Sequence, residues 1–217
     1  MALLGWLISI VARVMLRREW VQLRIELLRL HALHLRHPAS TPPRIAQAFL
    51  ITAEDHRFFK HRGVDAVAVG RAAWRTLVTD KREGASTIEM QLVRVLTGRF
   101  ERTVRRKVRE IGLATLVQSA VPRTEVPALY LGVAYYGTGM TGFTEACRRL
   151  GVRPRVLTPR QAAGMVARLK YPQPHGACES AQARIHRRTD HILRTYDRHA
   201  TRGLHGGLAT ELEHATI

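Results

Sequence analysis

Two carboxylates in this 217-residue sequence are placed where they could move a proton or organise cations. Glu54 follows an apolar stripe at helical spacing that begins at Ile45 and includes Phe49, so it is expected at the edge of a buried helix face. A carboxylate in that position loses hydration and becomes a better proton acceptor than an exposed one. A capped or salt-bridged structural glutamate would give the same pattern, so the stripe alone leaves both roles open.

The second carboxylate, Glu110, lies four residues after Arg106 and three after Lys107. On a helix these three side chains share one face, so the cations are expected to lower the pKa of Glu110 and keep it ionised. The cations fall near the start of the helix, where its dipole should repel them. A bound pyrophosphate would compensate, because backbone N–H groups and cationic side chains can bind it together. A solvated basic face paired with Glu101 and Glu110 is the alternative.

These two surroundings predict a division of roles between the carboxylates. Glu54 would act as a base, and Glu110 would organise cations or a bound divalent metal. Between them, the run Ser86-Thr87-Ile88-Glu89 fits a capping box, with Ser86 as the N-cap and Glu89 reaching back to it. In that interpretation Ser86 and Glu89 only initiate a helix.

Composition limits the fold and the partners. Aromatic residues are few, and Leu, Ala, Val and Arg are abundant, which favours a mainly α fold with one sizeable core. The 35 Lys and Arg residues exceed the 17 Asp and Glu residues, giving a net charge of +18 that indicates an anionic partner. No zinc-ligand spacing, basic heptad region or aromatic β platform supports nucleic acid. The two cysteines, Cys147 and Cys178, are expected to be buried free thiols.

The elements that must position the carboxylates begin after an N-terminal appendage. Residues 1–18 are apolar and are predicted to be a membrane anchor, although the run 2–12 covers only roughly half a hydrocarbon core as a helix. The charges that follow this run would favour a cytoplasmic domain by the positive-inside rule.

Residues 19–40 are predicted to be an amphipathic juxtamembrane helix and linker, which either lies on anionic lipid or packs on the domain. Its apolar positions at helical spacing are Trp20, Leu23, Leu27 and Leu30. A proline-rich break follows, with Thr41 as the expected start signal of the next helix. The catalytic domain is assigned to residues 41–200 and a tail to residues 201–217.

Several motifs resemble those of family 51 glycosyltransferases. The run 54–63 resembles the first signature, E-D-x-x-F-x-x-H-x-G, with its five fixed positions filled by Glu54, Asp55, Phe58, His61 and Gly63. The run 84–92 resembles G-x-S-T-x-x-Q-Q-L, and 106–110 matches R-K-x-x-E. Two further segments, 129–142 and 157–172, resemble the closing motifs of the family.

The resemblance implies a monofunctional peptidoglycan transglycosylase, similar to the transglycosylase domain of class A penicillin-binding proteins. It implies a mainly α, lysozyme-like helical domain with a membrane-proximal lobe. In the implied inverting reaction the 4-hydroxyl of lipid II attacks the growing lipid-linked glycan, and undecaprenyl pyrophosphate leaves. The implied setting is the bacterial inner membrane, with the catalytic domain facing the periplasm and cell-wall synthesis proteins as partners. The cofactor would be a divalent cation such as Mg²⁺, and nucleic acid would not be a partner.

The resemblance also assigns residues to roles. The catalytic pair is Glu54, the base, and Glu110, and the metal candidates are Glu110 and Asp55. The remaining residues of the first signature support the site, namely Asp55, Phe58, His61 and Gly63. The substrate-binding residues that the resemblance implies are Ser86, Thr87, Gln91, Arg94, Arg106 and Lys107.

The sequence departs from the family at a few positions. Met90 replaces the first glutamine of the Q-Q pair, Val95 and Gly132 replace asparagines, and Gln161 and Gln118 stand where glutamate is usual. A divergent, weakly active or non-catalytic lipid II-binding protein is therefore the alternative function. A lysozyme-like hydrolase is a further rival, but glycan cleavage has no phosphate leaving group that would need the basic motif.

Overall fold

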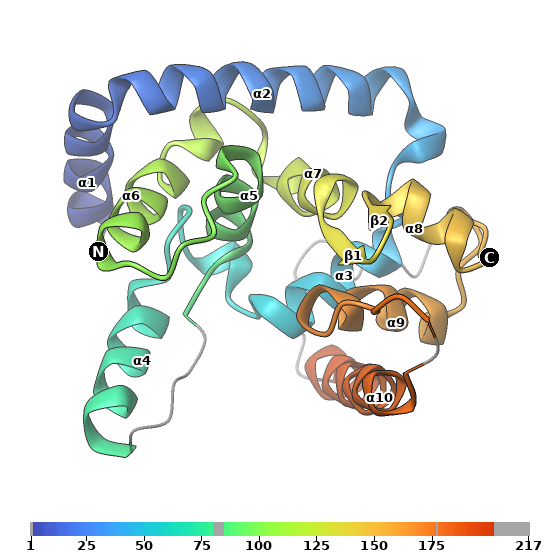
Figure 1. Ribbon diagram of the computed structural model, residues 1–217. Coiled ribbons are helices and arrows are strands. Elements are labelled where there is room, and N and C mark those ends of the chain that lie inside the picture. Colours follow the sequence, from blue (N-terminus) through green and yellow to red (C-terminus); the bar gives the residue numbers. More distant parts are fainter. Residues whose placement is uncertain (1, 80–84, 177, 202–217) are drawn as a thin grey trace. The chain divides into compact units, whose positions relative to one another are not determined.

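The computed structural model describes residues 2–79, 85–176 and 178–201 (Figure 1). These residues are mainly helical with one small two-stranded sheet, so the prediction of a mainly α, lysozyme-like helical fold is confirmed. The chain divides into two compact units. The first contains Met1–Leu33 and Arg57–Val126, and the second contains His34–His56 and Pro127–Ile217.

The first unit consists of α-helices and short 3-10 turns. Its helices are α1 (Ala2–Met15), α2 (Arg17–Arg36), α4 (Ala66–Thr79), α5 (Ile88–Thr97) and α6 (Val104–Ala114), with short 3-10 turns at Phe58–Lys60, Val117–Ser119 and Arg123–Glu125. α6 packs against both α1 and α5. Gly112 permits the close approach of α1, because a Cβ there would lie 3.2 Å from the Ala12 side chain and 3.1 Å from that of Leu16.

α2 packs on the protein through the stripe predicted from the sequence. Trp20, Leu23 and Leu27 are buried, so this stripe contacts the rest of the chain. Other apolar side chains of the same helix, Val21 and Ile25 among them, are exposed. No described helix is long and apolar enough to cross a membrane. The anchor predicted for residues 1–18 stays a prediction.

The break after α2 lies where the prolines predicted it, but its capping differs. α2 ends at Arg36, a 3-10 turn spans Pro38–Ser40, and α3 runs over Arg44–Glu54. The N-cap of α3 is Pro43, so the prediction that Thr41 starts this helix is wrong. Pro43 has the fixed φ that suits the position before a helix, and the Gln47 side chain donates to the Pro42 carbonyl at 2.8 Å.

The second unit surrounds α3 with the C-terminal helices. α3 packs on α9 (Pro159–Lys170) and α10 (Glu179–Ala200), and these two pack on each other. The remaining elements are α7 (Val126–Val133), α8 (Phe143–Arg149) and the antiparallel hairpin of β1 (Tyr135–Gly137) and β2 (Met140–Thr141). Phe49, Tyr136 and Phe143 are among the fully buried side chains of its core.

The cysteines are free, as expected, but only one is buried. Cys147 lies in the core, where burial raises the pKa of its thiol to about 11. Cys178 is exposed at the N-cap of α10, so the prediction of two buried thiols is wrong for this residue. Residues 202–217 of the predicted tail and Gly84 of the second signature lie outside the described residues.

Candidate active site

Glu110 is the centre of a cluster of cations in the first unit. Thr103 caps α6 by accepting from the Arg106 backbone N–H at 3.2 Å, which fixes the turn that carries Arg106 and Lys107. The Glu110 side chain is only 3% exposed. Arg94 of α5 donates to both its oxygens, at 3.0 and 2.9 Å, and Lys107 donates at 3.1 Å. Arg106 donates to it as well, so three cations bind one buried carboxylate.

The electrostatics of this cluster agree with the prediction for Glu110. Burial raises its pKa, but the hydrogen bond from Arg94 and the charge of Lys107 outweigh burial, so the net shift is downward. Burial lowers the pKa of Lys107, Glu110 opposes that shift, and Arg94 and Arg106 add to it, so its pKa lies below the usual value. The cluster carries more positive than negative charge and is suited to a further anion.

Ser86 belongs to this cluster and does not cap a helix. Its hydroxyl accepts from Lys107 at 2.8 Å and from Arg94 at 3.4 Å. The N-cap of α5 is Thr87, whose extended backbone precedes the helix and whose hydroxyl accepts from the Met90 N–H at 3.3 Å. The predicted capping box on Ser86 is therefore wrong. The N-cap lies one residue later, which leaves the Ser86 hydroxyl available to the cations.

Glu89 also has a role other than the predicted one. Its side chain is fully buried and accepts a hydrogen bond from the Gln118 amide at 3.1 Å. Glutamine at position 118 therefore supplies a donor where a glutamate would place a second carboxylate beside the first. No sequence signal linked these two residues, because they lie 29 positions apart on separate elements.

The first signature builds a tight turn that supports the second and third. Gly63 has φ +87°, and a Cβ there would lie 2.2 Å from the carbonyl oxygen of Ala114 at the end of α6. The Thr87 hydroxyl donates to the Gly63 carbonyl at 2.7 Å. Phe58 is buried under the Arg123 guanidinium, 4.8 Å from the ring centroid, and its ring meets that of His61 edge-on. Glycine is required here because any side chain would clash with backbone.

Glu54 lies in the second unit in a more open environment. It is the last residue of α3, and its side chain is 21% exposed. Arg188 of α10 donates to its carboxylate at 3.1 Å and to the Ala53 carbonyl at 2.9 Å. The buried Asp55 that follows is the C-cap of α3. Sequence reasoning missed Arg188, because a cation 134 positions from its partner leaves no local pattern.

The structure thus brings together most of the predicted substrate-binding residues of the first unit. Gln91 is half-buried on α5, the helix that carries Arg94. The residues that meet around Glu110 are Ser86, Arg94, Arg106 and Lys107.

The metal candidates fit a divalent cation unequally. Both oxygens of Glu110 already accept hydrogen bonds from cationic side chains. This carboxylate is therefore poorly suited to bind a metal cation as well. His61 and Glu89, both buried in the first unit, offer ligand atoms within 4.8 Å of each other, which is the arrangement a metal ion can bridge. Asp55 offers a buried carboxylate in the second unit.

The positions that depart from the family have different surroundings. Met90 is fully buried, so it fills core space, whereas Gly132 is exposed at the end of α7. Gln161 completes a capping box on α9, since it accepts from the Thr158 N–H at 2.9 Å and donates its own N–H to the Thr158 hydroxyl at 3.2 Å. Val95 is half-buried on α5.

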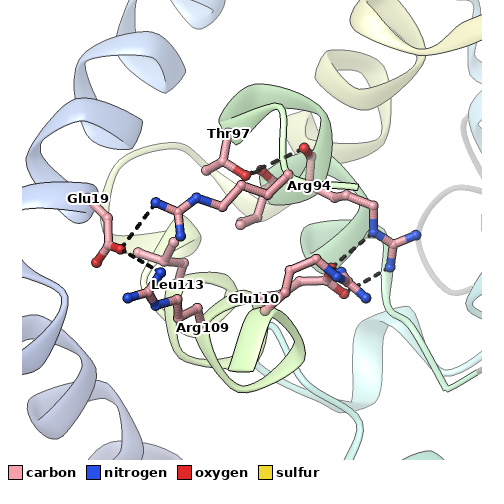
Figure 2. Close-up of a pocket in the computed structure, with 9 residues that line it drawn as sticks. Glu19, Arg94, Thr97, Arg109, Glu110 and Leu113 are labelled. Atoms are coloured by element: carbon pink, nitrogen blue, oxygen red, sulfur yellow. Dashed lines mark hydrogen bonds and ion pairs between the residues drawn. The ribbon is translucent and has the colours of Figure 1, made fainter. Parts of the chain in front are cut away.

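A small hollow of about 20 Å³ lies between α2, α5 and α6. Figure 2 shows Glu19 facing Arg109 across it, while Arg94 and Glu110 face each other. Its lining combines four arginines with two glutamates and a few apolar groups: Glu19, Val93, Arg94, Thr97, Arg99, Arg106, Arg109, Glu110 and Leu113.

Comparison with known proteins gives concordant matches. The model of the Transglycosylase family matches residues 31–197. A Cupriavidus necator protein named "Putative transglycosylase" is 33% identical over 136 residues, which cover 62% of this chain and 59% of that protein. Penicillin-binding protein 1A of Escherichia coli is 34% identical over 158 residues, which cover 72% of this chain and 18% of the relative. The chain thus spans less than two thirds of the length of either relative.

Proposed function

The chain belongs to the transglycosylase family, and on that basis we propose that it is a peptidoglycan glycosyltransferase that polymerises lipid II into β-1,4-linked glycan strands. The observation that carries the proposal is the cluster around Glu110. Arg94, Arg106 and Lys107 are held together by one buried carboxylate, with Ser86 as a further polar group. A pyrophosphate leaving group needs such an array, because charge accumulates on its oxygens in the transition state.

In the proposed inverting reaction the acceptor 4-hydroxyl attacks the anomeric carbon of the growing lipid-linked chain. The new C–O bond forms as the bond to pyrophosphate breaks, and the electron pair leaves on undecaprenyl pyrophosphate. Glu54 takes the hydroxyl proton, and Arg188 holds the Glu54 carboxylate in place through the contact at 3.1 Å. Lys107 and Arg106 offset the charge that develops on the leaving group.

A divalent cation, which we propose to be Mg²⁺, would supply further neutralisation of the pyrophosphate when bound. Glu89 is the buried carboxylate of the first unit that could hold it, and Asp55 is the candidate in the second unit, whereas the His61 imidazole suits a softer divalent ion than Mg²⁺. Glu110 acts in the proposal as the organiser of cations and not as a metal ligand, since Arg94, Arg106 and Lys107 already occupy its oxygens.

We place this activity at the bacterial inner membrane, with the catalytic domain facing the periplasm. Both substrates carry long lipids, so the enzyme has to work at a bilayer surface. Exposed apolar side chains on α1 and α2, such as Val14, Met15 and Ile25, and the net charge of +18 support this placement.

The test is polymerisation of labelled lipid II by the purified chain in detergent with Mg²⁺, run beside Glu54→Gln. We expect glycan strands from the parent and none from the variant, because the amide cannot accept the proton. Glu145→Gln is the matched control: Glu145 is an exposed glutamate that pairs with Arg148 and Arg149, and its loss should leave the rate unchanged. Binding of lipid II without polymer from any of the three proteins would replace the proposal with the lipid II-binding alternative.

A further inference from the structure

Two arginines at the edge of the hollow share a single, loosely held carboxylate. Arg99 and Arg109 approach the same oxygen of Glu19 at 3.5 and 3.6 Å, which is longer than a charge-assisted hydrogen bond. Within the described residues neither guanidinium has another ion-pair partner. Each is partly open to solvent, at 39% and 29% exposure.

The charges of the hollow do not balance. Four arginines, Arg94, Arg99, Arg106 and Arg109, surround it with only two glutamates, Glu19 and Glu110. Glu110 is already committed to Arg94, Arg106 and Lys107 at short distances. An additional anion would satisfy donors that Glu19 alone cannot reach.

We propose that Arg99 and Arg109 form a second anion site, which binds the phosphate group of an anionic phospholipid and is separate from the cluster around Glu110. Paired guanidinium forks match the several oxygens of a phosphate better than they match one carboxylate. Glu19 is the internal competitor of this site, because it occupies the same donors when phosphate is absent. The site does not depend on the proposed polymerisation, since it uses neither Glu54 nor Lys107.

Exposed apolar side chains close in sequence to the two arginines favour a lipid phosphate over free phosphate. Phe100, next to Arg99 in sequence, is 64% exposed, and Val104 and Val108, which lie one turn apart on α6, are exposed as well. Exposed apolar groups beside cations suit the boundary between headgroups and acyl chains. A site for free phosphate would not require exposed apolar groups.

The experiment measures binding of the full chain to phosphatidylcholine vesicles with and without phosphatidylglycerol, by flotation at physiological ionic strength. The double variant Arg99→Gln/Arg109→Gln is compared with Arg148→Gln/Arg149→Gln, which removes the same charge from an exposed pair on α8. We expect the first double variant to bind anionic vesicles about tenfold more weakly than the second. Equal loss in both would overturn the proposal, because binding would then follow net charge alone.

Removal of Glu19, the carboxylate that competes with the phosphate, should change vesicle binding in the opposite direction. Glu19→Gln should strengthen binding to anionic vesicles several-fold relative to Glu26→Gln, which removes an exposed glutamate paired with Arg29 on the same helix. No difference between these variants would also count against the site. In a separate experiment, inorganic phosphate is titrated into the full chain in solution. Tight binding there that Arg99→Gln/Arg109→Gln abolishes would assign the site to free phosphate and overturn the lipid assignment.

Discussion

The two carboxylates of the candidate site lie in opposite surroundings. Glu110 is 3% exposed and is bound by three cations, two of which come from its own helix. Glu54 is 21% exposed, and Arg188, from a helix far along the chain, binds it. A buried carboxylate among fixed cations stays ionised and organises charge, whereas a carboxylate that is more open can reach a substrate.

The largest effect is expected for Glu110→Gln. This change leaves Arg94, Arg106 and Lys107 close together without their shared counter-charge, so the free energy of unfolding should fall by about 3 kcal/mol. Chemical denaturation of the variant and the parent measures it. The control is Glu145→Gln, which removes a partly exposed glutamate paired with Arg148 and Arg149 at the surface and should shift the midpoint much less. If both variants unfold alike, the cluster does not stabilise the fold.

The contrast also predicts a pH dependence. The pKa of Glu110 in the folded protein lies below the ordinary value of 4.5, so its stabilising contribution is present above about pH 4.5 and is lost as the pH falls through the folded pKa. The difference in unfolding free energy between parent and Glu110→Gln should therefore be largest near neutral pH and shrink on acidification. Asp65, whose pKa is lowered by the Ala68 N–H and Arg57 against its burial, titrates in both proteins and cancels. A difference that stays constant down to pH 2 would contradict the assignment.

On the other side of the contrast, Arg188→Gln should impair catalysis more than folding. Without Arg188 the Glu54 carboxylate loses its contact at 3.1 Å, and we expect kcat to fall about tenfold with little change in KM. Arg188→Lys should restore part of the rate, since it keeps the charge. Arg187→Gln, an exposed neighbour on α10, is the matched control and should behave as the parent. A rise in KM at unchanged kcat would mean that Arg188 binds substrate and does not position Glu54.

The same contrast explains what could be predicted from the sequence. Arg106, Lys107 and Glu110 lie within one turn, so helical spacing alone predicted their meeting and the direction of the Glu110 pKa shift. Arg188 and Glu54 meet only because α10 packs on α3, and no local pattern encodes that packing.

The N-cap residues of α3 and α5 were also not predictable from the sequence. Adjacent polar residues are nearly equivalent as N-caps, and tertiary contacts decide between them. Ser86 was assigned as the cap of α5, whereas Thr87 has that place because its hydroxyl also donates to the Gly63 carbonyl. Thr41 does not cap α3 either, because the N-cap of that helix is Pro43, which makes no side-chain cap hydrogen bond.

The smallest effect is expected for Gln161→Glu, which restores the residue usual in the family. A glutamate at this third helical position completes the capping box with Thr158 as well as glutamine does, since either side chain accepts from the Thr158 N–H. The added charge near the N-terminus of α9 is favourable by a few tenths of a kcal/mol. Thermal unfolding should therefore shift by about 1 °C or less, and polymerisation should be unchanged. A several-fold gain in rate would show instead that this position acts on the substrate, and that the departure at Gln161 weakens the enzyme.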